Sequence, residues 1–234
     1  MDTRYVSKAG RDGWLTVRLE SGGEISLPQF LKVGVYDEKG GREYFEILEG
    51  AYKGRKASVK RKTASESYLI TGITQLPGGS VRFDRAKQAL WYGGKGPYSA
   101  FSGAFTYQGA SFTQVPPGSY PLQVPDAPHS ATRPAYYSYA DYHKTWFRLG
   151  LSLTGSRFLH VGEISEGCVT VRAFVFDPAK PAVPGFEDLP KLPAGAIGRP
   201  YPAATIPLGD WDDLYSYLII RRANDQSVGT LVVQ

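Results

Sequence analysis

Closely spaced glycine and proline residues restrict the fold more than any other feature of the sequence. The 234 residues include 27 Gly and 17 Pro, and 13% are aromatic, whereas long helical patterns are few. Glycine and proline favour turns, and aromatic residues favour strands. The sequence therefore predicts a mainly β protein built from short strands joined by many turns.

The turn residues Pro77, Gly78 and Gly79 mark the best boundary within the chain. Before this boundary, apolar and polar residues alternate over residues 14–19, which predicts a half-buried strand. Further strands are expected over residues 30–36, 42–48 and 56–62. We interpret residues 1–76 as a small accessory β domain, without a catalytic constellation, and residues 77–234 as a second domain.

The second part of the chain is also predicted to form strands, with one helix near its end. A hairpin is expected over residues 80–92, and further strands over residues 98–105, 169–176 and 228–233. Asp210 is a suitable N-cap for a helix, since acidic residues are favourable in a first turn. Leu214, Tyr217 and Leu218 then form an apolar stripe at helical spacing.

Composition and charge narrow the classes of function. No apolar run is long enough to span a membrane, and the first residues lack the apolar segment of a secretory signal. The net charge is only +5. Its densest basic group has no accompanying aromatic stacking motif, so a solvated strand face is favoured over a nucleic-acid surface. That group consists of Lys53, Arg55, Lys56, Lys60, Arg61 and Lys62.

The single cysteine, Cys168, excludes an intramolecular disulfide. The three histidines are spread too widely to suggest a zinc site, so neither a metal nor another cofactor is expected. Cys168 follows Ser165 and Gly167, and His160 lies eight positions upstream. A thiol with a pKa of about 8.5 is mostly protonated at neutral pH, and a neighbouring imidazole can take its proton.

This pattern predicts Cys168 as a nucleophile, with His160 as its base. Gly167 has the backbone freedom to point its own N–H and that of Cys168 at an oxyanion. The alternative is a buried, inert cysteine. His143 is the rival candidate for the base, but His160 is favoured because its strand leads toward the one that carries Cys168.

The segment Ser165-x-Gly167-Cys168-Val169 resembles the signature of the L,D-transpeptidase (YkuD-type) catalytic domain. That family has a His followed by Ser/Thr-x-Gly-Cys and an aliphatic residue. Two further stretches resemble its early strands and a turn, and the resemblance covers residues 78–234. These stretches are Leu90-Trp91-Tyr92 with Phe101-Ser102-Gly103, and Val115-Pro116-Pro117-Gly118-Ser119-Tyr120.

Two features depart from the common pattern of this family. Thr170 stands where an Arg is usual, and only seven residues separate His160 from Cys168. This shorter motif resembles a branch found in type VI secretion effectors that attack peptidoglycan. The resemblance implies a β sandwich with one C-terminal helix for the second domain.

The resemblance also implies a cysteine acyltransferase that acts on peptidoglycan stem peptides. Ser165 would fix the turn or hydrogen-bond His160. Three arginines are candidates for holding the substrate carboxylate, because a guanidinium matches a carboxylate with two hydrogen bonds. These are Arg148, Arg157 and Arg172, and His129, Ser102 and Gly103 would line the cleft.

As an effector, the protein would be exported by a specialised apparatus and would act in the periplasm of a target cell. An immunity protein is then a possible partner. Whether the acyl group passes to an amine or to water is left open. Two alternatives also stay open, a non-catalytic β module that binds cell wall and a general Cys-His peptidase.

Overall fold

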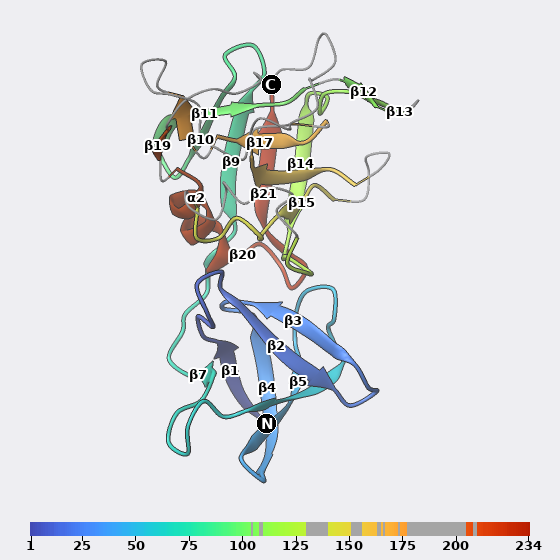
Figure 1. Ribbon diagram of the computed structural model, residues 1–234, viewed down its shortest axis with the longest axis vertical. Coiled ribbons are helices and arrows are strands. Elements are labelled where there is room, and N and C mark those ends of the chain that lie inside the picture. The colour runs from blue at the N-terminus through green and yellow to red at the C-terminus, as the bar shows by residue number, and fades with distance from the viewer. Residues whose placement is uncertain are drawn as a thin grey trace.

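The computed structural model describes residues 1–103, 105–107, 110–129, 140–150, 156–162, 165, 167–172, 174–176, 205–207 and 210–234. The protein is mainly β, with 48% strand and 6% helix, which confirms the predicted class. Figure 1 shows two bodies stacked along the long axis, with the N-terminus in one and the C-terminus at the far end of the other. The sheets curl into a half-barrel and a near-barrel.

The first body is a seven-stranded antiparallel sheet in the order β3-β2-β6-β5-β4-β1-β7. Its strands are β1 (Asp2–Val6), β2 (Trp14–Leu19), β3 (Glu24–Pro28), β4 (Lys32–Lys39), β5 (Arg42–Ile47), β6 (Lys56–Lys60) and β7 (Leu69–Ile70). The strands expected over residues 14–19, 42–48 and 56–62 are confirmed as β2, β5 and β6. The strand expected over residues 30–36 starts only at Lys32, because Phe30 has a positive φ of 62° that interrupts an extended chain.

The second body is an eight-stranded sheet in the order β14-β21-β9-β10-β11-β17-β16-β15. Its strands are β9 (Gly79–Asp84), β10 (Ala89–Tyr92), β11 (Lys95–Phe101), β14 (Gly118–Gln123), β15 (Phe147–Arg148), β16 (Phe158–Val161), β17 (Val169–Val171) and β21 (Ser227–Val233). Its pairs β16–β17 and β9–β21 are parallel. The predicted hairpin over residues 80–92 is confirmed as β9 and β10.

Three short strand pairs complete the described β structure. They are β8 (Leu76–Pro77) with β20 (Arg221–Arg222), β12 (Phe105–Tyr107) with β13 (Ala110–Phe112), and β18 (Phe174–Phe176) with β19 (Thr205–Pro207). The apolar run expected as one strand over residues 169–176 is therefore divided between β17 and β18.

The predicted helix is present as α2 (Asp210–Ile219), at the side of the second body near the junction (Figure 1). Leu214 and Leu218 are buried as expected, whereas Tyr217 is only partly buried. The arginines after the helix satisfy its last carbonyls: Arg221 donates to Tyr217 O, and Arg222 donates to Ile219 O. Within the described residues, no helix is long and apolar enough to cross a membrane.

Polar side chains join the two bodies. Arg222 Nη2 lies 2.6 Å from Glu49 Oε1, and both side chains are buried. The indole of Trp14 donates to Thr145 Oγ1 over 3.0 Å, also out of contact with solvent. The basic group predicted as a solvated face includes Lys53, Arg61 and Lys62, which form salt bridges with Asp225, Glu38 and Glu66.

Candidate active site

Three neighbouring strands, β15, β16 and β17, carry or adjoin three of the predicted site residues, Arg148, His160 and Cys168. Successive side chains of a strand point to opposite faces of the sheet. One face of these strands consists of buried apolar residues and forms part of the core: Phe147, Leu159, Val161, Val169 and Val171. The residues between them in sequence, including Arg148 and His160, therefore face the other way.

The register orders that second face into two rows. Arg148 pairs with Phe158, and His160 pairs with Thr170. Leu159 pairs with Val169, so continuing the register by one residue sets Cys168 beside Phe158. Adjacent strands lie about 4.8 Å apart. Cys168 thus directly precedes β17, the strand that pairs in parallel with the strand of His160.

His160 is held in one orientation and as a neutral ring. Its Nδ1 lies 2.8 Å from Val161 O, an acceptor, so Nδ1 carries the proton. Its Nε2 lies 3.2 Å from Thr170 Oγ1 and can accept a proton. Burial lowers the pKa of His160 to about 4, the bond to Val161 opposes this shift, and nearby His129 adds to it. At neutral pH His160 is therefore uncharged, and Nε2 is its acceptor nitrogen.

Cys168 is buried, with 7% of its surface exposed, whereas a nucleophile is expected to be open to its substrate. His160 is similarly enclosed, at 6%. The hydroxyl of Ser165 donates to Cys168 O over 2.7 Å. Of the two roles considered for Ser165, this contact corresponds to fixing the turn before β17.

Gly167 is required by the turn that carries Cys168. Its φ is +76°, and a Cβ built there would lie 2.2 Å from Arg157 Nη1 and 2.5 Å from Thr113 O. Its N–H donates to Gly103 O over 3.0 Å. This bond corrects the expected role of Gly167: its N–H is committed to Gly103 and does not point at an oxyanion.

Ser102 and Gly103 follow the end of β11 and make different contacts. Ser102 is buried, and its Oγ accepts a hydrogen bond from Val115 N over 3.1 Å. Gly103 lies so close to Ser165 that a Cβ would come within 2.9 Å of Ser165 O. Gly103 thus positions the cysteine turn, whereas Ser102 holds the backbone at Val115; both contacts differ from the expected substrate contacts.

The three candidate arginines lie in different surroundings. The guanidinium of Arg157 packs against Gly167, beside the cysteine turn. Arg172 lies over the ring of Phe101, 5.3 Å from its centroid. Arg148 lines a separate pocket near the first body. The structure therefore does not gather them into one carboxylate site.

Trp146 connects two of the histidines. Its ring stacks on His129 at 4.3 Å and on His160 at 4.4 Å. Two imidazoles stacked at these distances cannot share one face of an indole, so His129 and His160 lie on opposite faces. Sequence reasoning missed Trp146. Its position two residues before Arg148 is the signal that places it on the same strand face.

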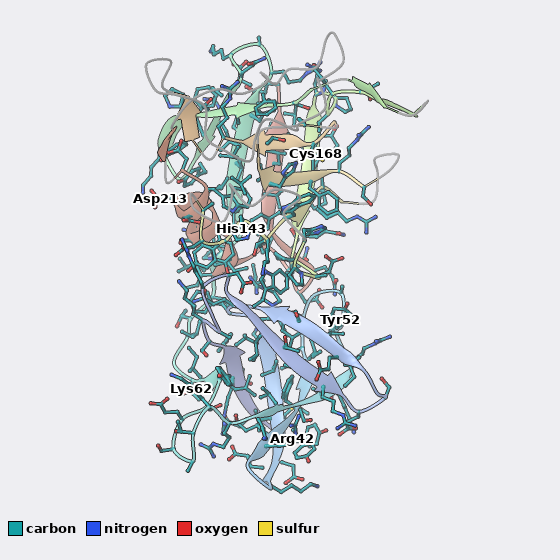
Figure 2. All side chains as sticks on the ribbon, in the orientation of Figure 1. Arg42, Tyr52, Lys62, His143, Cys168 and Asp213 are labelled. Atoms are coloured by element: carbon teal, nitrogen blue, oxygen red, sulfur yellow. The ribbon has the colours of Figure 1, made fainter. Side chains whose placement is uncertain are left out.

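His143, the rival base, lies elsewhere. Its Nδ1 is 2.7 Å from Ala140 O, and Figure 2 shows it toward the junction of the two bodies, away from Cys168. In the described part of the chain, no three His, Cys, Asp or Glu side chains gather closely enough to hold a metal ion. Comparison with known proteins gives no match to a protein-family model, a curated protein or a solved structure.

Proposed function

We propose that the protein is a cysteine acyltransferase of the L,D-transpeptidase type that acts on peptidoglycan stem peptides. The observation that carries this proposal is that His160 lies on β16 and Cys168 directly precedes β17, the parallel neighbour of β16. The hydrogen bond from Nδ1 to Val161 O supports it further, because it leaves Nε2 as the nitrogen that can accept the thiol proton.

In the proposed reaction, Cys168 Sγ attacks the carbonyl carbon of the bond between diaminopimelate and D-alanine. His160 Nε2 takes the thiol proton and delivers it to the departing amine of D-alanine. In the resting site Thr170 Oγ1 lies 3.2 Å from Nε2. The acyl-enzyme then passes its acyl group to an amine or to water, and His160 removes the proton of that acceptor.

Arg157 is the group that we assign to the negative charge of the substrate. Its guanidinium lies against Gly167, next to the nucleophile in sequence. A fixed guanidinium stabilises either a developing oxyanion or a carboxylate. The Gly167 N–H cannot share this task while it donates to Gly103.

The choice of peptidoglycan as substrate comes from the resemblance carried by Ser165, Gly167 and Cys168. The short spacing from His160 supports the effector branch in particular. In that role the protein would act in the periplasm of a target cell after specialised export, and an immunity protein would protect the producer.

Mass spectrometry of a purified stem tetrapeptide incubated with the protein tests the proposal. We expect loss of the terminal D-alanine, or its replacement by an added labelled D-amino acid. The Cys168→Ala variant is expected to form neither product. An unchanged tetrapeptide, or equal conversion by Cys168→Ala, would refute the proposal.

A non-catalytic module that binds cell wall is the second candidate, and the burial of Cys168 favours it. Sedimentation with insoluble peptidoglycan separates the two. The module predicts binding without any product and with equal affinity in Cys168→Ala. The enzyme predicts turnover that this variant loses.

A further inference from the structure

A pocket of about 180 Å³ lies at the junction of the two bodies. Ala51 of the first body forms one side, and segments around β14, β15 and β21 form the rest. The polar residues that line it are Gln123, Asp126, Arg148 and Gln226, and Trp146 provides an aromatic wall. The pocket is large enough for several water molecules or one small organic molecule.

Two opposite charges line this pocket without neutralising each other. Arg148 Nε is buried and has no hydrogen-bond partner among the described residues. Across the residues that the structure describes, neither Arg148 nor Asp126 takes part in a salt bridge. A buried donor without an acceptor is costly and usually has a partner. A ligand that carries a negative and a positive group can meet both charges at once.

We infer that this pocket binds a free amino acid as a zwitterion. The carboxylate of the ligand binds the Arg148 guanidinium, which offers two parallel donors, and its ammonium group binds Asp126. Val124 and Pro125, which also line the pocket, give a small side chain an apolar surface. Only a short ligand fits the volume, so glycine and alanine are the best candidates.

This site goes beyond the proposed reaction and does not depend on it. The ligand would contact Trp146, whose two faces carry His129 and His160. Binding should therefore change the fluorescence of this tryptophan. The bound amino acid would contact Trp146, and Trp146 in turn stacks on His160.

Isothermal titration of the full chain carrying Cys168→Ala tests the site without turnover. The probes are L-alanine, D-alanine, glycine, acetate and methylammonium. We expect saturable binding of at least one amino acid, and much weaker binding of acetate and methylammonium, because each meets only one of the two charges. Acetate binding as tightly as alanine would overturn the zwitterion assignment.

Arg148→Gln and Asp126→Asn should each weaken amino-acid binding by about ten- to a hundredfold, the range for one hydrogen bond to a charged group. Arg18→Gln, an exposed change on β2, is the matched control and should leave binding unchanged. If Arg148→Gln does not fold, Asp126→Asn at the partly exposed end decides the question. Absence of amino-acid binding, or unchanged affinity in both pocket variants, would overturn the inference.

The test of the amino-acid pocket and the test of the proposed function give independent results. Tetrapeptide conversion by the wild type reports on Cys168, whereas titration of Cys168→Ala reports on the pocket alone. Either result can fail while the other stands.

Discussion

Gly167 is the residue of the site with the least freedom to change. A Cβ at this position would collide with the Thr113 carbonyl and with the Arg157 guanidinium, and its φ is +76°. Gly54 has a similar φ of +85°, but a Cβ added there would meet nothing within 4 Å. Alanine substitutions at Gly54 and Gly167 therefore separate the free-energy cost of the left-handed backbone conformation from that of steric overlap.

We expect Gly54→Ala to lower the free energy of unfolding by about 1 kcal/mol, the usual cost of a left-handed conformation. Gly167→Ala should lower it by a further ~1–3 kcal/mol, because overlap in a packed region adds to that cost. Urea unfolding of both variants measures the difference. Equal losses would mean that the turn adapts to a side chain and that Gly167 is not sterically required.

The buried, neutral His160 should make stability depend on pH. Its pKa is lowered from an ordinary 6.5 to about 4, so between these values the unfolded chain binds the proton more strongly than the folded one. Stability from this group is complete above pH 6.5 and is lost as the pH falls toward 4. The full loss is about 3 kcal/mol.

Urea unfolding of the wild type and of His160→Gln between pH 4 and pH 8 tests this. The wild type should lose more stability on acidification than the variant, whereas above pH 6.5 the two curves should run parallel. A wild type that is as insensitive to acid as His160→Gln would contradict the buried, neutral assignment.

For individual residues, the sequence singled out Cys168 and His160 as the proposed nucleophile and base, but it did not predict the residues around them. The Ser-x-Gly-Cys motif singled out Cys168, and proximity along the chain favoured His160. Trp146 and Thr170 contact His160 only because of the strand register, which no local motif encodes. The use of the Gly167 N–H by Gly103 likewise depends on the end of β11 passing beside the turn.

Among the elements, alternation of apolar and polar residues was a reliable guide where one face of a strand is buried. It predicted β2, and the other expected strands β5, β9 and β21 are also present. It missed β1, whose first residues are exposed and whose burial pattern does not alternate. The parallel pairing of β16 with β17 sets the strand of His160 beside the strand that Cys168 precedes, and it is a property of the topology rather than of either segment.

A buried ion pair joins β20 to the first sheet. Arg222 and Glu49 are 7% and 3% exposed at their side chains, and Glu49 also accepts from Lys32 N and Gln75 Nε2. Removing one partner of a buried pair leaves an uncompensated charge, which costs about 3–5 kcal/mol. We therefore expect Glu49→Gln to lower the free energy of unfolding by about 3 kcal/mol.

Asp225→Asn is the matched control, since Asp225 and Lys53 form an exposed salt bridge across the same junction. Solvent screens exposed pairs, so this variant should have nearly wild-type stability. Chemical denaturation of both variants makes the comparison. A Glu49→Gln variant as stable as Asp225→Asn would show that the buried pair does not stabilise the junction.

Across the whole molecule, the two bodies are expected to unfold together. Domains joined by a small polar interface move independently by default. Here the Glu49–Arg222 pair and the Trp14–Thr145 hydrogen bond are both buried at the junction. Opening the junction would expose these groups, so separation of the bodies carries a free-energy cost.

Hydrogen exchange measured by mass spectrometry in increasing urea tests this coupling. Peptides covering β5 in the first body and β21 in the second should become unprotected at the same urea concentration. In Glu49→Gln the two should diverge. Separate transitions in the wild type would contradict the coupling and indicate two independent bodies.

The overall division was visible in the sequence only as a turn-rich boundary near Pro77. The two large sheets do separate there, since the first uses residues 2–70 and the second begins at Gly79. The junction was not predictable, because its contacts pair residues from distant parts of the chain. Glu49 and Arg222 are an example, and neither belongs to a recognisable motif.

In the proposed mechanism the substrate acylates Cys168, with His160 as the base. Mass spectrometry of the intact protein, and of its digest, after mixing with a stem tetrapeptide and quenching in acid tests this step. We expect the protein to gain the tripeptide acyl group as D-alanine leaves, and the digest to place the group on the peptide that contains Cys168. Acylation should be much slower in His160→Gln and absent in Cys168→Ala. Conversion of the tetrapeptide with Cys168 never modified, or acylation at the same rate in His160→Gln, would refute the mechanism.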